Sequence, residues 1–106
     1  VYSKQVPIRE ALLIPLDIKK HDKEPNKYIV NSYWQAFNYH ADEKVESVLE
    51  CEDSSVKIDK PSQKLKVSDY GATYELTIPK DTKSGTIFSC RRYLDDRYNR
   101  FATFNF

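Results

Sequence analysis

The last third of the chain, residues 73–106, constrains the fold most, because it reads as three short strands joined by two turns. Apolar and polar residues alternate along the strand segments, which is the periodicity of an extended strand with one buried face. The turn segments are rich in Asp, Lys and Asn, with one Gly. We expect strands at 74–79, 86–90 and 101–106 and turns at 80–85 and 95–99, a meander that is typical of a β-sandwich.

The strongest strand pattern upstream covers residues 28–40. Trp34 lies on one face of this segment, and we expect that face to point into the core. The opposite face would leave its aromatic rings partly exposed. Its aromatic members are Tyr33, Phe37 and Tyr39.

Four further segments also alternate, namely residues 6–18, 45–51, 56–58 and 65–67. Pro15 interrupts the first, so we expect an edge strand or one that changes sheets there. Residues 45–52 fit a helical period as well, and we favour the strand. About eight short strands with regular turns predict an all-β fold, an antiparallel β-sandwich of seven or eight strands.

One stretch of the C-terminal third resembles the corner between strands E and F of immunoglobulin-type domains. The resemblance is carried by Leu76-Thr77-Ile78, Gly85, Phe88 and Cys90. Trp34 precedes the first cysteine of the chain, whereas antibody domains have the order Cys–Trp–Cys. The resemblance therefore implies an immunoglobulin-like sandwich in the broad sense, which includes fibronectin type III and macroglobulin-like domains.

The chain also resembles the GOLD domains of cargo-sorting proteins. That resemblance is carried by Gly85, Asp95, Asp96 and the closing strand 104–106. GOLD domains are β-sandwiches too, so both resemblances imply the same fold class. Neither supplies a catalytic residue.

Size and charge limit the functions that the chain can have. Its 106 residues suit a single domain, and we expect residues 1–106 to be one domain excised from a larger protein, since the chain starts at Val1 and is still strand-like at its end. Charged residues make up 31% of the chain with a net charge of +1, which argues against nucleic acid as a partner that binds a basic surface. The longest apolar run, residues 11–14, is too short for a membrane span.

Cys51 and Cys90 are the only cysteines. Both lie on alternating segments, so both could face inward. They predict either a disulfide in a secreted domain or two buried thiols in a cytoplasmic one, and we favour the disulfide.

Residues with catalytic or metal-binding chemistry are sparse. His21 and His40 lie near predicted turns without the short His or Cys pairs of zinc sites, so we expect no metal and no cofactor. Cys90 with His40 is the one nucleophile–base pairing worth naming. The acidic run at residues 50–53 is expected to be a solvated turn, and the isolated Gly71 and Gly85 exclude a glycine-rich phosphate loop. We expect no catalytic residue and no enzyme activity.

Arginine and aromatic residues interleave around the last hairpin, which is the most distinctive surface feature. Such residues are enriched at protein–protein hot spots, and they also stack on single-stranded nucleic acid. Asp95 and Asp96 are expected to pair with Arg97 and Arg92, so ion pairs and stacking within the fold are the third interpretation. The candidate binding residues are Arg91, Tyr93, Arg97, Tyr98 and Arg100, with Tyr33, Phe37 and Tyr39 as possible neighbours.

The pattern as a whole favours a non-enzymatic protein–protein interaction or adhesion module of a larger secreted, luminal or cell-surface protein. A structural spacer in a multidomain array is one alternative. A module that binds carbohydrate or single-stranded nucleic acid through the final hairpin is another.

Overall fold

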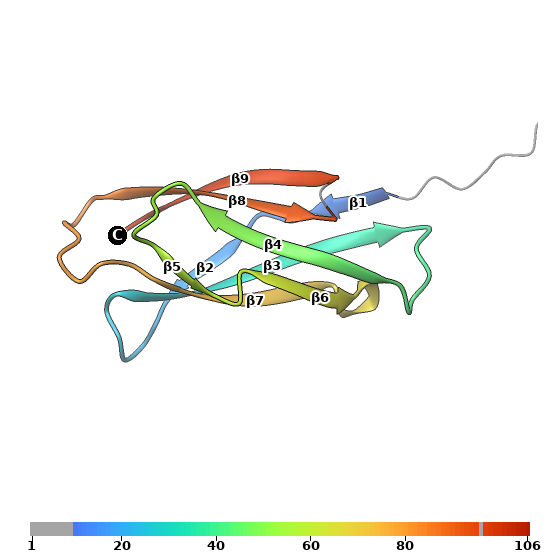
Figure 1. The fold of residues 1–106 in the computed structure, drawn as a ribbon, viewed down its shortest axis with the longest axis horizontal. Helices are drawn as coiled ribbons and strands as arrows, with labels where there is room; N and C mark the ends of the chain where they lie inside the picture. The colour runs from blue at the N-terminus through green and yellow to red at the C-terminus, as the bar shows by residue number, and fades with distance from the viewer. Residues whose placement is uncertain (1–9, 96) are drawn as a thin grey trace, which may run out of the picture.

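The computed structural model describes residues 10–95 and 97–106, and in this part of the chain nine strands form two antiparallel sheets (Figure 1). The all-β fold predicted from the sequence is confirmed, with one strand more than expected. The first sheet contains β1 (Glu10–Leu13), β2 (Asp17–Lys20), β3 (Lys27–Phe37), β7 (Gly71–Thr77) and β5 (Lys57–Asp59). The second contains β6 (Ser62–Lys66), β4 (Lys44–Cys51), β8 (Ile87–Leu94) and β9 (Tyr98–Asn105), in that order.

The additional strand arises at Pro15, which divides the first expected strand into β1 and β2. Both halves pair with β3, so the chain stays at one edge of the first sheet and does not change sheets at Pro15. Residues 6–9 of that expected strand lie outside the described residues.

The change of sheet occurs instead at Lys60 and Pro61. β5 pairs with β7 of the first sheet, and β6, two residues later, pairs with β4 of the second. Lys60 has a positive φ of 50°, and the carbonyl of Pro61 accepts a hydrogen bond from Leu49 N–H at 2.9 Å. The crossing thus lies between the strands expected at residues 56–58 and 65–67, where one extended segment passes from sheet to sheet.

Alternation sets the two faces of the central strands β3, β4, β7 and β8, as predicted. Residues 44–51 form β4, and the described residues contain no α-helix, only a single turn of 3₁₀ helix, η1 (Val67–Asp69). Along β3 every second residue from Tyr28 to Trp34 is buried, and Trp34 is 1% exposed. None of the described residues forms a helix long and apolar enough to cross a membrane.

A buried hydroxyl pair joins the two sheets in the centre of the core. Tyr74 Oη of β7 donates a hydrogen bond to Ser47 Oγ of β4 at 2.6 Å, and both residues are 1% exposed. Burial raises the pKa of Tyr74, so the phenol is neutral and serves as a donor. The sheets are therefore aligned by a directional contact as well as by apolar packing.

Cys51 and Cys90 form a disulfide, which decides between the two interpretations of the cysteines. They are directly opposite each other on β4 and β8, with Cα atoms 3.9 Å apart. Cys90 is 4% exposed and Cys51 is partly buried. The bridge connects neighbours within one sheet, whereas the antibody disulfide connects two sheets.

Removing the disulfide should lower stability substantially. The bond closes a separation of 39 residues, for which the chain-entropy model gives about 4 kcal/mol. Urea unfolding of the double variant Cys51→Ala/Cys90→Ala, compared with the oxidised protein, measures this difference. Equal unfolding free energies would show that the sheet ladder alone holds these strands.

Tyr74→Phe should lower the free energy of unfolding by about 1–2 kcal/mol, because Ser47 Oγ loses its buried donor. Thermal unfolding measures the loss. Ser47→Ala is the matched partner, and the double variant should cost clearly less than the sum of the two single changes. Additive costs would mean that the two hydroxyls do not interact.

Candidate functional site

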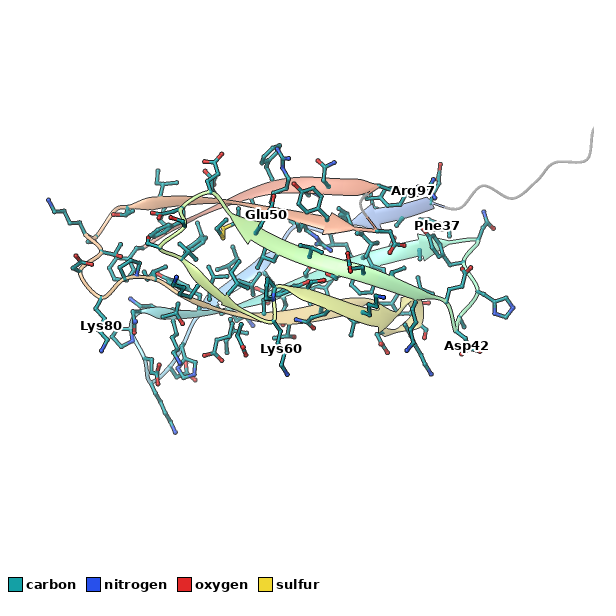
Figure 2. The ribbon with its side chains drawn as sticks, viewed as in Figure 1. Phe37, Asp42, Glu50, Lys60, Lys80 and Arg97 are labelled. Atoms are coloured by element: carbon teal, nitrogen blue, oxygen red, sulfur yellow. A yellow bond between two sulfur atoms is a disulfide. The ribbon has the colours of Figure 1, made fainter. Side chains whose placement is uncertain are left out.

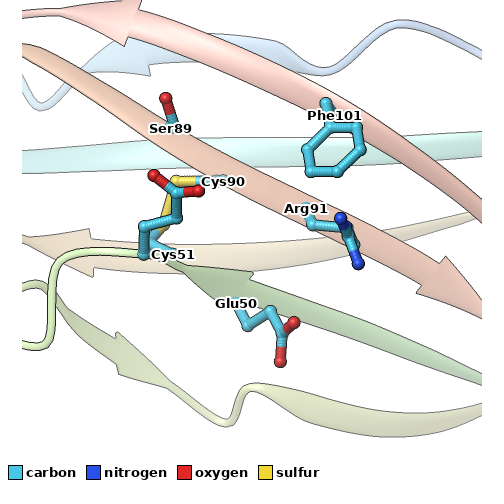
Figure 3. Close-up of a pocket in the computed structure, with 7 residues that line it drawn as sticks. Glu50, Cys51, Ser89, Cys90, Arg91 and Phe101 are labelled. Atoms are coloured by element: carbon cyan, nitrogen blue, oxygen red, sulfur yellow. A yellow bond between two sulfur atoms is a disulfide. The ribbon is translucent and has the colours of Figure 1, made fainter.

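The outer face of the second sheet carries an ordered group of polar and aromatic side chains, here called the outer-face cluster: Glu50, Arg91, Tyr93 and Phe101. Glu50, Arg91 and Phe101 are directly opposite one another on the neighbouring strands β4, β8 and β9. Figure 3 shows these three side chains beside the disulfide. The cluster thus contains two of the predicted binding residues, Arg91 and Tyr93, and two that the prediction omitted.

The guanidinium of Arg91 holds the cluster together. It lies 3.8 Å from the centroid of the Phe101 ring, and its Nη1 donates a hydrogen bond to Tyr93 Oη at 3.1 Å. Tyr93 Oη in turn donates to Glu50 Oε1 at 2.8 Å. Phe101 nevertheless remains 61% exposed. The result is a large apolar ring that is held in place by its neighbours and presented to solvent.

A shallow pocket of about 230 Å³ adjoins this cluster. The disulfide and Ser89 lie in its wall (Figure 3), and Glu52 also lines it. The acidic run at residues 50–53 does not act as one unit: Glu50 belongs to the cluster, and Asp53 Oδ1 accepts hydrogen bonds from Ser55 N–H and Oγ at 2.9 and 2.6 Å. These bonds to Ser55 lower the pKa of Asp53, so it is a turn-stabilising carboxylate.

Arg92 does not take part in the surface that the sequence predicted. It is 1% exposed and points into the interior, because alternation along β8 places it on the same face as Cys90 and Leu94. Its Nη1 and Nη2 donate to the carbonyls of Ile14 and Tyr33 at 2.6 and 2.7 Å. Burial lowers the pKa of Arg92 to about 10, and this arginine joins the two sheets.

Arg100 reaches the same segment of the first sheet. It is directly opposite Arg92 on β9, and its Nη1 donates to the carbonyl of Leu13 at 2.9 Å. The two arginines therefore hold the end of β1 against the second sheet.

Asp95, the residue after β8, is held by two hydrogen bonds to Glu46 of β4. Where the sequence predicts an ion pair with Arg97, Asp95 Oδ1 accepts a hydrogen bond from Glu46 N–H at 2.7 Å, and Asp95 N–H donates to the Glu46 carbonyl at 2.9 Å. Asp96 lies outside the described residues. Arg97 is exposed and lies 5.6 Å from the ring of the partly buried Tyr98.

Tyr39 comes close to this turn as predicted. Burial raises the pKa of Tyr39, and Tyr98 and Asp95 raise it further. Tyr39 is partly buried against the core, so its ring packs between the β3–β4 connection and the final hairpin. Of the three possible neighbours, this one adjoins the hairpin.

Tyr33 and Phe37 point away from the final hairpin. They alternate with the inward residues of β3, so they lie on the outer face of the first sheet, 42% and 50% exposed. Figure 2 shows Phe37 and Arg97 at the same end of the molecule. The ring of Tyr33 covers Gly71, where a Cβ would approach Tyr33 Cδ1 to 2.8 Å. The predicted binding residues are thus divided between two opposite faces, and their role in binding remains a prediction.

The histidines and cysteines have structural contacts. His21 Nδ1 accepts hydrogen bonds from the N–H groups of Lys23 and Glu24 at 3.1 and 3.2 Å and stabilises that loop. Cys90 is bonded to Cys51 and provides no free thiol for a pairing with His40. Within residues 10–95 and 97–106, no three His, Cys, Asp or Glu side chains are grouped as a metal site would require.

Arg92→Ala should lower the free energy of unfolding by about 3 kcal/mol or more, because two buried carbonyls lose charge-assisted hydrogen bonds. The neighbouring Arg91→Ala is the matched control, since Arg91 lies on the outer face, and its cost should stay below about 1 kcal/mol. Urea unfolding of both variants measures the difference. Similar costs for the two arginines would contradict the structural role of Arg92.

Comparisons with known proteins add no relative. No family model, no curated protein and no solved structure matches the chain. The immunoglobulin-like resemblance therefore remains a prediction, and the site has to be interpreted from its geometry.

Proposed function

We propose that this domain is a non-enzymatic protein–protein interaction or adhesion module of a larger secreted, luminal or cell-surface protein, and that it binds its partner through the outer-face cluster. The observation that carries the proposal is Phe101, an aromatic ring that is 61% exposed on a rigid strand. A contact with Arg91 at 3.8 Å holds the ring in place.

The chemistry of the cluster suits a protein partner. Aromatic and arginine side chains provide large contact areas, and they dominate binding energy when they are desolvated at the centre of an interface. Arg91 and Tyr93 are already ordered by their mutual hydrogen bond. Less conformational entropy is lost on binding when the side chains are pre-organised in this way.

The compartment is part of the same proposal. A disulfide between Cys51 and Cys90 persists in oxidising environments, which favours a secreted or luminal location over the cytoplasm. Adhesion and receptor ectodomains work in such environments. The partly buried bond also keeps β4 and β8 together beneath the cluster.

The proposal predicts that Phe101→Ala weakens partner binding at least about tenfold, since truncating a hot-spot aromatic costs about 2 kcal/mol. Proteins captured from extracts of the source organism are to be quantified by mass spectrometry, and binding of the recovered protein is then titrated. Phe37→Ala is the matched control, because Phe37 is also an exposed phenylalanine, 50% exposed on the outer face of the other sheet.

Both variants should keep a melting temperature within a few degrees of the parent protein, as surface truncations do. The proposal fails if no captured protein depends on Phe101. It also fails if Phe37→Ala reduces binding as much as Phe101→Ala, because the contact face would then be the first sheet.

A further inference from the structure

The four edges of the two sheets are not equally protected against pairing with another strand. Proteins block exposed edges with lysine, proline and interrupted strands. Pro15 interrupts the β1–β2 edge, and Pro61 separates the edges of β5 and β6, which also carry Lys57, Lys64 and Lys66. β9 is an uninterrupted strand of eight residues that contains neither proline nor lysine. Of the four edges, the β9 edge is therefore the one without lysine, proline or an interruption.

The backbone of β9 has a row of groups directed away from its own sheet. Phe106 N–H donates to the Thr86 carbonyl, which places the even-numbered residues of the last strand in the ladder with β8. The N–H and C=O groups of the odd-numbered residues point to the other side. In the described chain β9 pairs with β8 alone. The outward-directed residues are Asn99, Phe101, Thr103 and Asn105.

This edge is also positively charged. Residues 87–106 contain four arginines, two aspartates and no other charged side chain, a net charge of +2, whereas the whole chain carries +1. Arg92 and Arg100 are adjacent, and both bond to carbonyl oxygens. Besides burial, only two titratable neighbours among the described residues, Tyr74 and Arg100, shift the pKa of Arg92. The positive charge at the start of β9 is thus not neutralised by these contacts.

A pocket at the start of β9 has room for a carboxylate that would balance this positive charge. It has a volume of about 480 Å³ and lies between β1 and the first residues of β9. Its lining includes Arg97 and Arg100, together with Leu12 and Tyr98. A carboxylate that enters here meets two guanidinium groups, and guanidinium forks bind carboxylates strongly.

We propose that the β9 edge binds an extended, acidic segment of the partner protein, which adds a fifth strand to the second sheet and sets a carboxylate against Arg97 and Arg100. This inference rests on the proposed interaction function and specifies its partner. In an added strand, the residue opposite Phe101 lies on the outer face and contacts its ring, whereas the residue opposite Arg100 lies on the inner face. The segment should therefore alternate apolar with acidic residues.

A second copy of this chain fits the edge less well. In an antiparallel contact of two β9 strands, the end of one copy that carries Arg97 and Arg100 would face residues 103–105 of the other, and residues 98–105 contain no carboxylate that could bind these arginines. An acidic segment of a different protein supplies the opposite charge.

The test uses the oxidised full chain and two nine-residue peptides, one alternating Glu with Val and one alternating Lys with Val. The Glu peptide should bind, more weakly as salt increases, and the Lys peptide should not. Thr103→Pro removes one outward N–H without touching the β8 ladder, and it should weaken binding about tenfold or more, as expected when a hydrogen bond is lost and a ring obstructs the strand. Thr103→Val, which keeps the N–H, is the matched control.

Hydrogen exchange of the unaltered protein provides a readout that does not require any variant to fold. The Glu peptide should slow exchange at the amides of Phe101, Thr103 and Asn105. Unchanged exchange at these amides overturns the edge proposal, as does equal binding of the Lys peptide. A dimer in light scattering that Thr103→Pro abolishes also overturns it, because the occupant is then a second copy.

The two proposals can fail separately. A partner that depends on Phe101 but binds the Thr103→Pro protein as tightly as the parent protein would leave the interaction function in place and overturn the added strand. Loss of binding with Thr103→Pro but not with Thr103→Val supports the added strand.

Discussion

The buried guanidinium of Arg92 is the interaction on which the rest of the structure depends. A cation in the interior is stabilised when its N–H groups meet oxygen acceptors, and the carbonyls of Ile14 and Tyr33 accept hydrogen bonds from the two terminal nitrogens of Arg92, whereas its Nε has no partner among the described residues. Tyr74 and Ser47 add a second polar contact between the sheets. Because each contact has a fixed direction, the sheets cannot slide over one another as two purely apolar faces could.

The inward position of Arg92 decides what its neighbours do. Arg91 and Tyr93 must then point outward, since alternate residues of a strand lie on opposite faces. β8 has β4 on one side and β9 on the other, so Arg91 is flanked by Glu50 and Phe101 in a single row. The cluster is therefore formed by paired strands and not by a loop, which makes its geometry more rigid than that of a loop site.

Much of the fold could be predicted from the sequence, because the period of two is a local property. The inward Trp34, the β4 strand and the C-terminal hairpin all follow from alternation. Arg92 was missed because arginine is rarely buried, and its position was judged by side-chain type instead of by the alternation of Phe88, Cys90 and Leu94. That alternation is the signal that could have found it.

Other features depend on pairing between distant segments, which periodicity does not report. The separation of Phe37 from the final hairpin follows from the assignment of β3 and β8 to different sheets. The choice between thiols and a disulfide required the register that sets Cys51 opposite Cys90. The sequence separated the expected strands at residues 56–58 and 65–67, but whether the chain would turn back or cross to the other sheet between them depended on the partners of β5 and β6.

The crossing of β5 and β6 has a mechanical consequence. A single backbone segment is hydrogen-bonded to both sheets, with only Lys60 and Pro61 between the two ladders. A tensile load that pulls one layer along the strand axis past the other would therefore have to rupture a backbone ladder on that flank, and not merely shear apolar side chains. The flank formed by β1 and β9 has no such covalent link, so under load the layers would begin to part there.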